Sequence, residues 1–396
     1  MAYQKFRADK LFDGYRMHDN HQVLITSDEG IVKDIVHINE AGDNVQEFSG
    51  ILTPGFINCH CHLELSHMQG SITEKIGLIE FVTRVIKDRH FPEEQIFDAI
   101  DKAERQMLDE GIVAVGDICN NQLTIPQKAK GRLYYHNFIE ASGFVPQLAE
   151  TRFERAKDIY DAFSNKLSGN STYSPLGAGG FNSIVPHAPY SVSEELWKKI
   201  IGFADNRVMT MHNQEMAAEN DLFLKKEGEF LQFYEQLNMD ASAFRASGKS
   251  SLQTCLPKFL HEQPLILVHN IYTSAEDLAY CQSLSHPPDI YWCFCPNANL
   301  YIGGLLPDID LFIKNNVPIV LGTDSLASNY QLSIVSEMRT LQRNFPFVKL
   351  EKLLGWATIN GAKALHLGDR LGSFERGKKP GMVLCEATLT GAKRLL

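Results

Sequence analysis

The chain alternates short apolar runs with longer amphipathic segments, and this alternation limits its fold more than any other feature. Helix-length segments, such as residues 93–110 and 193–206, separate the apolar runs. Buried strands that alternate with helices are typical of a parallel sheet, and eight such units in series predict a (β/α)8 TIM barrel. The eight runs expected to be strands are 51–60, 111–119, 132–141, 181–189, 208–213, 264–270, 289–296 and 317–325.

The two ends of the chain have a different pattern. The first fifty residues contain short β-like runs such as "HQVLITSDEG" and "VQEFSG", and the tail "GSFERGKKPGMVLCEATL" is similar. A length of 396 residues suits a barrel with a small appendage. We therefore expect residues 1–53 and 367–396 to form one small β-sandwich domain beside a barrel at 54–366.

Histidines fall where the predicted strands end. The stretch "NCHCHLELSHMQG" places His60 and His62 at the end of the first strand, and burying imidazole without a partner is costly. Because the carboxyl ends of all barrel strands meet at one mouth, the polar residues at these ends should meet there too. A single strand-end histidine is usually an ordinary polar residue, but this series predicts a metal site of nitrogen and oxygen ligands. The other members of the series are His187, His212, His269 and Asp324.

Composition excludes several classes of function. The net charge is −10 and no long basic run is present, which argues against nucleic-acid partners. No apolar stretch reaches the eighteen or so residues of a membrane helix, and the N-terminus lacks the apolar core of a signal peptide. We therefore expect a cytoplasmic protein with a small-molecule substrate. The eight cysteines form no CxxC pair and are expected to be buried free thiols.

Six motifs together resemble the amidohydrolase superfamily, in its cytosine-deaminase and chlorohydrolase branch. That branch includes guanine, S-adenosylhomocysteine and aminodeoxyfutalosine deaminases. The order and spacing of the six motifs make the resemblance specific, whereas one motif alone would be weak. The motifs are "GILTPGFINCHCHLE", "VPHAPYS", "MHNQEMAAEN", "LVHN", "CPNANLYIGG" and "VLGTDSLASN".

The resemblance implies one divalent metal, with Zn²⁺ favoured and Fe²⁺ or Mn²⁺ as alternatives. Relatives that bind two metals use a carboxylated lysine on the fourth strand. The fourth predicted strand of this chain reads "SIVPHAPYS" and contains no lysine. Glu140, at the end of the third strand, could bridge a second metal, but we favour a carboxylate hydrogen-bonded at the barrel rim and therefore a single metal. A homodimer is typical of the family. The implied ligands of the single metal are His60, His62, His212 and Asp324.

This constellation predicts hydrolytic deamination of an aromatic amidine, either a purine base or an adenosine-type nucleoside. A metal-activated hydroxide would attack the ring carbon, with Glu215 as the proton shuttle and with His269 and Asp324 assisting. An amidase or chlorohydrolase acting on another C–N or C–Cl bond is the alternative, and a barrel without catalysis is a third hypothesis. The expected substrate contacts are Glu64, His187, Asn297 and Asn299, and Glu64 resembles the ribose-binding carboxylate of aminodeoxyfutalosine deaminases.

The segment 214–263 is expected to form one wall of the pocket. It carries four aromatic residues that could stack on a substrate ring. Their helical spacing is also that of an ordinary helix core. These residues are Phe230, Phe233, Tyr234 and Phe244.

Overall fold

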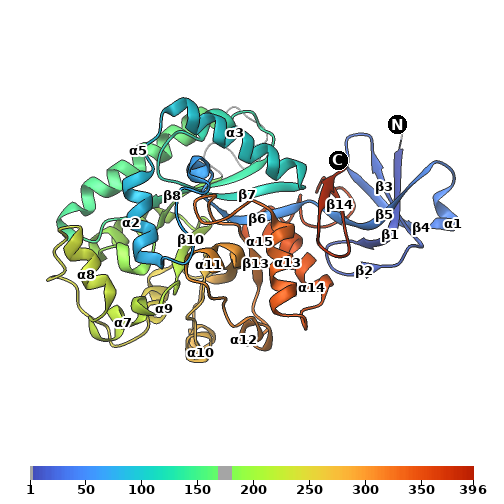
Figure 1. The fold of residues 1–396 in the computed structure, drawn as a ribbon. Coiled ribbons are helices and arrows are strands. Elements are labelled where there is room, and N and C mark those ends of the chain that lie inside the picture. Colours follow the sequence, from blue (N-terminus) through green and yellow to red (C-terminus); the bar gives the residue numbers. More distant parts are fainter. Residues whose placement is uncertain (1–2, 168–180) are drawn as a thin grey trace.

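The computed structural model describes residues 3–167 and 181–396 of the chain, a mixed α/β structure. Eight strands form two four-stranded parallel sheets, in the orders β6-β7-β8-β9 and β10-β11-β12-β13. Hydrogen bonds join the sheets at both edges. The N–H of His212 donates to the carbonyl of His187 (2.9 Å), and the N–H of Thr323 donates to the carbonyl of His60 (2.9 Å). The strands thereby close into the predicted barrel (Figure 1).

Each observed barrel strand after the first falls inside its predicted apolar run, although the eighth spans only Ile319–Leu321 of the predicted 317–325. Every residue of β6, β7, β9, β10 and β11 is buried, as expected when helices cover a parallel sheet. The strands are β6 (Phe56–Cys61), β7 (Ile112–Cys119), β8 (Tyr134–Ala141), β9 (Asn182–Pro186), β10 (Met209–Asn213), β11 (Pro264–His269), β12 (Asp289–Phe294) and β13 (Ile319–Leu321).

Amphipathic helices follow the strands and pack against them. In α3 the buried residues Ile96, Ile100, Ala103 and Met107 recur every three or four positions, so one face of the helix turns inward. The principal helices are α2 (Leu78–Asp88), α3 (Glu93–Asp109), α4 (Ile125–Lys128), α5 (Ala149–Leu167), α6 (Glu194–Ala204), α7 (Ala217–Lys225), α8 (Glu229–Gln236), α9 (Ser251–Cys255), α10 (Ala275–Ser283), α11 (Pro296–Ile302), α12 (Ile309–Lys314), α13 (Ile334–Asn344), α14 (Leu350–Gly355) and α15 (Gly361–Ala364). Within the described ranges, no helix combines the length and apolar character needed to cross a membrane.

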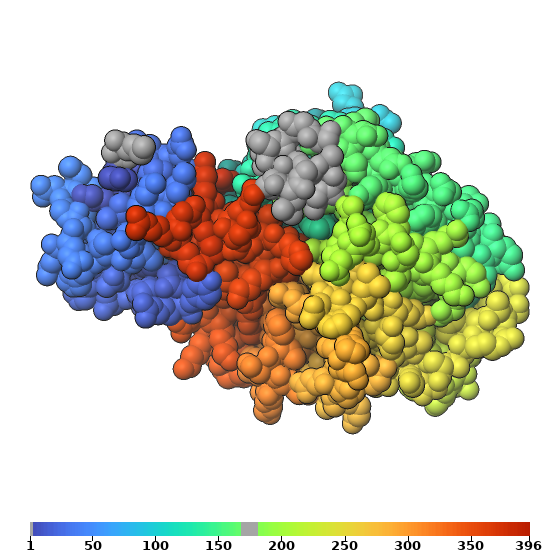
Figure 2. Space-filling model, turned by 180° about the vertical axis from the view of Figure 1, so that it is seen from behind, coloured from blue at the N-terminus to red at the C-terminus, as the bar shows by residue number. Residues whose placement is uncertain are grey.

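The two chain ends meet in a seven-stranded mixed sheet beside the barrel. Its order is β15-β14-β5-β1-β3-β4, with β2 paired to β1. In the described part of the chain these strands make one hydrogen-bonded sheet, not the two sheets of the expected sandwich. Figure 2 shows C-terminal residues lying between the N-terminal strands and the barrel. The strands are β1 (Tyr3–Phe12), β2 (Met17–His18), β3 (Gln22–Ser27), β4 (Val32–His37), β5 (Val45–Pro54), β14 (Met382–Cys385) and β15 (Ala392–Arg394).

The predicted first barrel strand, 51–60, is in fact two strands. Residues up to Pro54 belong to β5 of the terminal sheet, and β6 begins at Phe56. A Cβ on the intervening Gly55 would lie 2.7 Å from the carbonyl oxygen of Pro380, so a side chain there would collide with the backbone. One continuous apolar run therefore contains strands of two different sheets, because the chain crosses from one sheet to the other at Gly55. The domain limits at residues 53 and 367 stay predictions.

Candidate active site

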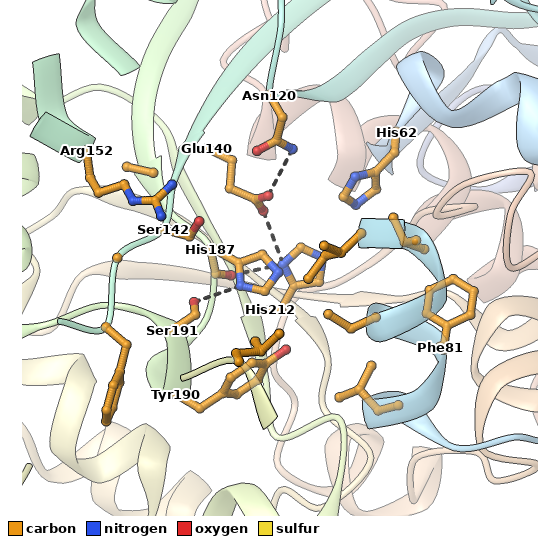
Figure 3. Close-up of a pocket in the computed structure, with 18 of the residues that line it drawn as sticks. His62, Phe81, Asn120, Glu140, Ser142, Arg152, His187, Tyr190, Ser191 and His212 are labelled. Atoms are coloured by element: carbon orange, nitrogen blue, oxygen red, sulfur yellow. Dashed lines mark hydrogen bonds and ion pairs between the residues drawn. The ribbon is translucent and has the colours of Figure 1, made fainter. Parts of the chain in front are cut away.

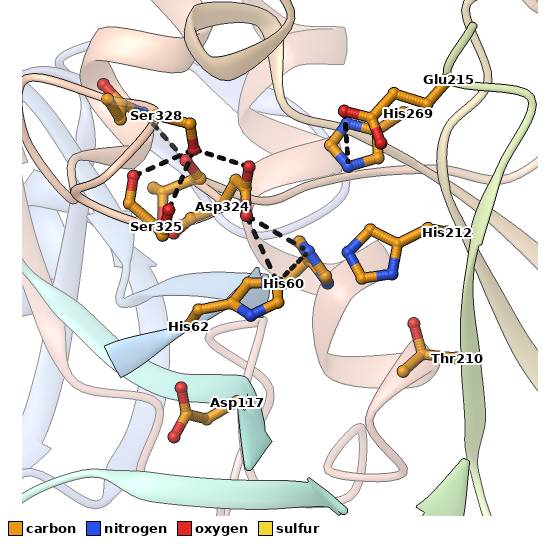
Figure 4. Close-up of polar contacts among 12 residues, drawn as sticks. His60, His62, Asp117, Thr210, His212, Glu215, His269, Asp324, Ser325 and Ser328 are labelled. Atoms are coloured by element: carbon orange, nitrogen blue, oxygen red, sulfur yellow. Dashed lines mark hydrogen bonds and ion pairs between the residues drawn. The ribbon is translucent and has the colours of Figure 1, made fainter. Parts of the chain in front are cut away.

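The structure brings the strand-end histidines and Asp324 together at the carboxyl mouth of the barrel (Figure 4). The Nε2 atoms of His60 and His62 are 3.2 Å apart. The Oδ1 atom of Asp324 lies 3.3 Å from Nε2 of His62 and 3.7 Å from Nε2 of His60. His60, His62 and His212 each offer a ligand nitrogen within 4.8 Å of the others. Side chains from three distant strands thus form one compact cluster.

The geometry of a β-strand explains how one short segment places side chains both in the histidine cluster and in the hydrophobic core. In β6, alternate side chains point to opposite faces, so His60 and His62 point to the barrel mouth while Cys59 points toward the helices. A Cβ on Gly361 of α15 would lie 3.0 Å from the Cys59 sulfur. All eight cysteines are free and buried, as the sequence predicts.

The residues of the cluster fit a divalent cation. The Nδ1–H of His212 donates to the carbonyl of His187 (2.9 Å), which leaves its Nε2 lone pair available. Burial lowers the pKa of His62 to about 3, although the charge of Asp324 acts in the opposite direction, and burial also lowers the pKa of His212. Both imidazoles are therefore neutral at neutral pH, which is the state that binds metal. Neutral imidazoles with one carboxylate are a typical Zn²⁺ ligand set.

Asp324 is held in an unusual backbone conformation. Its φ is +57°, in the left-handed region that non-glycine residues rarely adopt. Its N–H donates to the carbonyl of His60 (3.0 Å), and its Oδ2 accepts from the Ser328 hydroxyl (2.7 Å). Burial alone would raise the pKa of this carboxyl, but the hydrogen bond from His60 and the charge of His62 hold it well below its ordinary value. Asp324 is thus an ionised carboxylate aimed at the cluster.

Glu215 and His269 form a second pair beside the cluster. Oε1 of Glu215 lies 3.6 Å from Nε2 of His269. Burial raises the pKa of Glu215 to about 7, although the charge of His269 lowers it. A carboxyl group that titrates near neutral pH can both accept and release a proton there. Nδ1–H of His269 donates to Oδ1 of Asn299 (2.7 Å), which fixes the ring orientation and leaves Nε2 facing Glu215.

A cavity of about 440 Å³ opens over these groups, with Glu64, Glu140 and His187 in its wall. The backbone N–H of Asn120 donates to Glu64 (2.9 Å), and its side-chain amide donates to Glu140 (3.1 Å). Burial raises the pKa of both carboxyl groups to about 7. The second oxygen of Glu64 is buried without a hydrogen-bond partner. Nδ1 of His187 lies 2.7 Å from the Ser191 hydroxyl (Figure 3).

Glu140 also lies near the histidine cluster. Its Oε1 is 3.5 Å from Nδ1 of His212. Glu140, His187 and His212 form a second group whose ligand atoms lie within 4.8 Å of one another. Because Nδ1 of His212 already donates to a carbonyl, it has no lone pair for a second cation. This geometry favours Glu140 as a hydrogen-bonded carboxylate at the barrel rim over Glu140 as the bridge to a second metal.

Two predicted substrate contacts lie outside the cavity wall. Asn297 bonds to α13, where its N–H and side-chain amide both donate to Glu337. Asn299 lies behind His269 and supports that ring. Both asparagines follow the seventh strand and were expected to contact substrate, but α11 begins at Pro296 and turns them away from the cavity. Their positions do not support a contact with substrate.

The four aromatic residues of the segment 214–263 divide between two roles. Phe233 and Tyr234 of α8 line the cavity. Phe230 stacks on Tyr190 at 4.1 Å between ring centroids, and Phe244 packs on Phe144 at 5.8 Å, as in an ordinary core.

Sequence reasoning missed several residues of the cavity wall. Asn120 directly follows β7, so its strand-end position could have identified it by the same rule as the histidines. Arg89, Arg152 and Arg155 also line the cavity, but they lie on or beside helices and no motif marks them.

Known proteins resemble this chain along most of its length. The family model described as "Amidohydrolase family" matches residues 51–394. An adenosine deaminase of Helicobacter pylori is 27% identical over 383 residues, which is 91% of this chain and 87% of that protein.

Solved structures share the fold. The H. pylori aminofutalosine deaminase in complex with methylthio-coformycin matches with a TM-score of 0.79 at 20% identity, and the match covers 99% of this chain and 97% of that one. An adenosine deaminase from Xanthomonas campestris with bound zinc matches with a TM-score of 0.71 at 18% identity, over 96% and 84% of the two chains. Because the family model covers every strand of the barrel, the chain belongs to the amidohydrolase family and is a hydrolase.

Proposed function

We propose that the protein is a metal-dependent deaminase of an aromatic amidine, either a purine base or an adenosine-type nucleoside. The observation that carries the proposal is Glu215, a buried carboxyl with a pKa of about 7, beside His269 and the histidine cluster. Deamination needs such a group because a proton must move from water to the departing nitrogen. The adenosine deaminase named above supports the choice of substrate class.

The proposed ligands of one cation are His60, His62, His212 and Asp324. Zinc is favoured by their chemistry and by the zinc in the X. campestris structure. When bound, the cation supplies the Lewis acidity that lets water ionise near neutral pH. The sequence of β9 contains no lysine for a second metal, which supports a single ion.

In the proposed mechanism Glu215 performs the proton transfers. It accepts a proton from the attacking water and delivers it to a ring nitrogen, and a second proton passes through it to the leaving ammonia. Asp324 accepts a hydrogen bond from the water and orients it toward the ring carbon. His269 contacts the attacking water through the lone pair of its Nε2, since its Nδ1–H donates to Asn299.

Glu64 and His187 are the proposed substrate contacts. The unpartnered oxygen of Glu64 supports the acceptance of hydrogen bonds from sugar hydroxyls, because a buried acceptor without a partner is costly. His187 can contact a ring nitrogen or oxygen of the substrate. A cytoplasmic location and a homodimeric assembly remain predictions.

Ammonia release from the zinc-loaded protein tests this function. The panel comprises adenine, guanine, adenosine and 5′-substituted adenosines, with an amide and a chlorotriazine as comparison substrates. We expect ammonia from at least one purine compound. Turnover restricted to the amide, or chloride release from the triazine, would refute the deaminase assignment.

A further inference from the structure

We propose that Gln214 is a positioning residue, which holds the proton shuttle Glu215 opposite His269. Gln214 does not line the cavity, and it acts through the backbone that it shares with Glu215. The inference rests on the deaminase function proposed above and identifies a residue outside the cavity on which the proton transfers depend.

The carboxyl group of Glu215 has little support of its own. Within the described part of the chain it accepts no hydrogen bond, and its ion pair with Nε2 of His269 spans 3.6 Å (Figure 4). A general acid–base group must nevertheless lie within hydrogen-bond reach of the atoms that it serves. Because no contact holds the carboxyl itself, its position depends on the backbone from which the side chain projects.

Gln214 directly precedes Glu215 and is held far more firmly. It is fully buried, and its φ of +48° lies in the left-handed region. Its N–H donates to Oε1 of Glu219 (3.0 Å), and its carbonyl accepts from the N–H of Tyr272 (3.0 Å). Both backbone polar groups of this residue therefore have partners, which fixes the turn that leads into Glu215.

The side-chain amide of Gln214 is equally well bonded. Nε2 donates to Oδ2 of Asp277 (2.9 Å) and to Oδ1 of Asn220 (3.3 Å). Oε1 accepts from the Thr273 hydroxyl (2.6 Å) and from the side-chain amide of Asn213 (3.3 Å). The orientation of the amide follows from Asp277, because a carboxylate oxygen can only accept. A buried amide with every group paired is costly to displace, so Gln214 has one stable position.

Gln214 also reaches the segment that carries His269. Tyr272 and Thr273, which both bond to Gln214, lie three and four residues after His269. His269 and the next residue, Asn270, are both left-handed, with φ of +75° and +58°. Two such residues in succession persist only where the surrounding contacts enforce them. Gln214 therefore joins the loop after His269 to the backbone of the proton shuttle.

The variant Gln214→Met tests this role, because it keeps the size of the side chain and removes its four hydrogen bonds. The assay is ammonia release by the zinc-loaded protein from adenosine, or from the 5′-substituted adenosine that turns over fastest. We expect kcat to fall roughly 10- to 100-fold, as is typical when a group that orients a catalytic residue is lost. KM and zinc content should stay nearly unchanged, because Gln214 does not line the cavity.

Gln127→Met is the matched control, because Gln127 is also a buried glutamine in a polar network. Its Nε2 donates to Oδ1 of Asp101 (3.1 Å) and to Oε2 of Glu104 (2.6 Å), and it lies outside the cavity wall. Both variants should unfold at lower urea concentration than the wild type. Only Gln214→Met should lose kcat, which separates positioning from a general loss of stability.

Thr273→Val supplies a second variant that decides the question even if Gln214→Met does not fold. It removes only the hydroxyl that donates to Oε1 of Gln214, and we expect kcat to fall about 2- to 10-fold, as for one neutral hydrogen bond. Where both changes can be combined, Thr273→Val should add nothing to Gln214→Met, because the hydroxyl acts through Gln214. Independent effects would overturn that route.

The crystal structure of Gln214→Met gives a readout that does not depend on activity. The separation between Oε1 of Glu215 and Nε2 of His269 should differ from the 3.6 Å of the wild type. The proposal fails if this geometry and kcat are both retained, or if Gln127→Met loses as much kcat. Failure of the deaminase function would look different, since the wild type itself would release no ammonia, and the two crystal structures would still test the positioning.

Discussion

Replacing Lys128 with Met should destabilise the folded protein through the charge that it leaves behind. Lys128 and Asp117 are fully buried, with Nζ 2.5 Å from Oδ2, and Nζ also donates to Oδ1 of Asn137 (2.7 Å). Burial lowers the pKa of Lys128, but the charge of Asp117, together with Cys119 and the hydrogen bonds to both groups, holds the pKa above its ordinary value. Removing one partner of a buried pair costs about 3–5 kcal/mol. Met fills most of the volume that Lys128 leaves. The loss of stability therefore comes from the uncompensated charge of Asp117 and not from a cavity.

The measurement is the free energy of unfolding in urea at pH 7. Oδ1 of Asp117 accepts from the N–H of Leu63 (2.8 Å), the residue after His62, and an asparagine carbonyl can still accept that bond. Adding Asp117→Asn to Lys128→Met should therefore recover at least half of the loss. Lys314→Met is the matched control, because Lys314 pairs with Asp310 on the surface, where solvent screens the pair and its loss should cost far less. If Lys128→Met costs no more than this control, the account of the buried pair is wrong.

Three other perturbations test the site and its surroundings. Asp324→Asn should sharply lower zinc content measured by elemental analysis after dialysis, and full occupancy would remove Asp324 from the ligand set. Glu215→Gln should keep its zinc and lose roughly 10²–10⁴ in kcat, the range for a general acid–base group, whereas an unchanged kcat would exclude Glu215 as the shuttle. Burial raises the pKa of Glu219 to about 8, so between pH 5 and 8 the folded state holds a proton that the unfolded state has released. The free energy of unfolding of the wild type should therefore fall by about 3–4 kcal/mol relative to Glu219→Gln over that range, and parallel pH profiles would contradict this pKa.

The sequence predicted the barrel and the cluster of histidines with Asp324 because both depend on strand periodicity and strand order. Once β6 is a buried strand, His60 and His62 must share a face, and parallel connections bring Asp324 to the same mouth. Local patterning was less informative at the chain ends. There β5 pairs with β14, whose residues lie more than 300 positions away, and an apolar run does not reveal which sheet it joins.

By itself the sequence determined the series of buried strands and the chemistry at their ends, since burial patterns and ligand types are local properties of the chain. Tertiary structure decided what each polar group faces. It turned Asn297 toward α13, placed Asn299 behind His269, and brought Arg152 and Arg155 to the cavity wall. These outcomes depend on where helices begin and how they pack, because a side chain's environment is set by distant elements that no single motif describes.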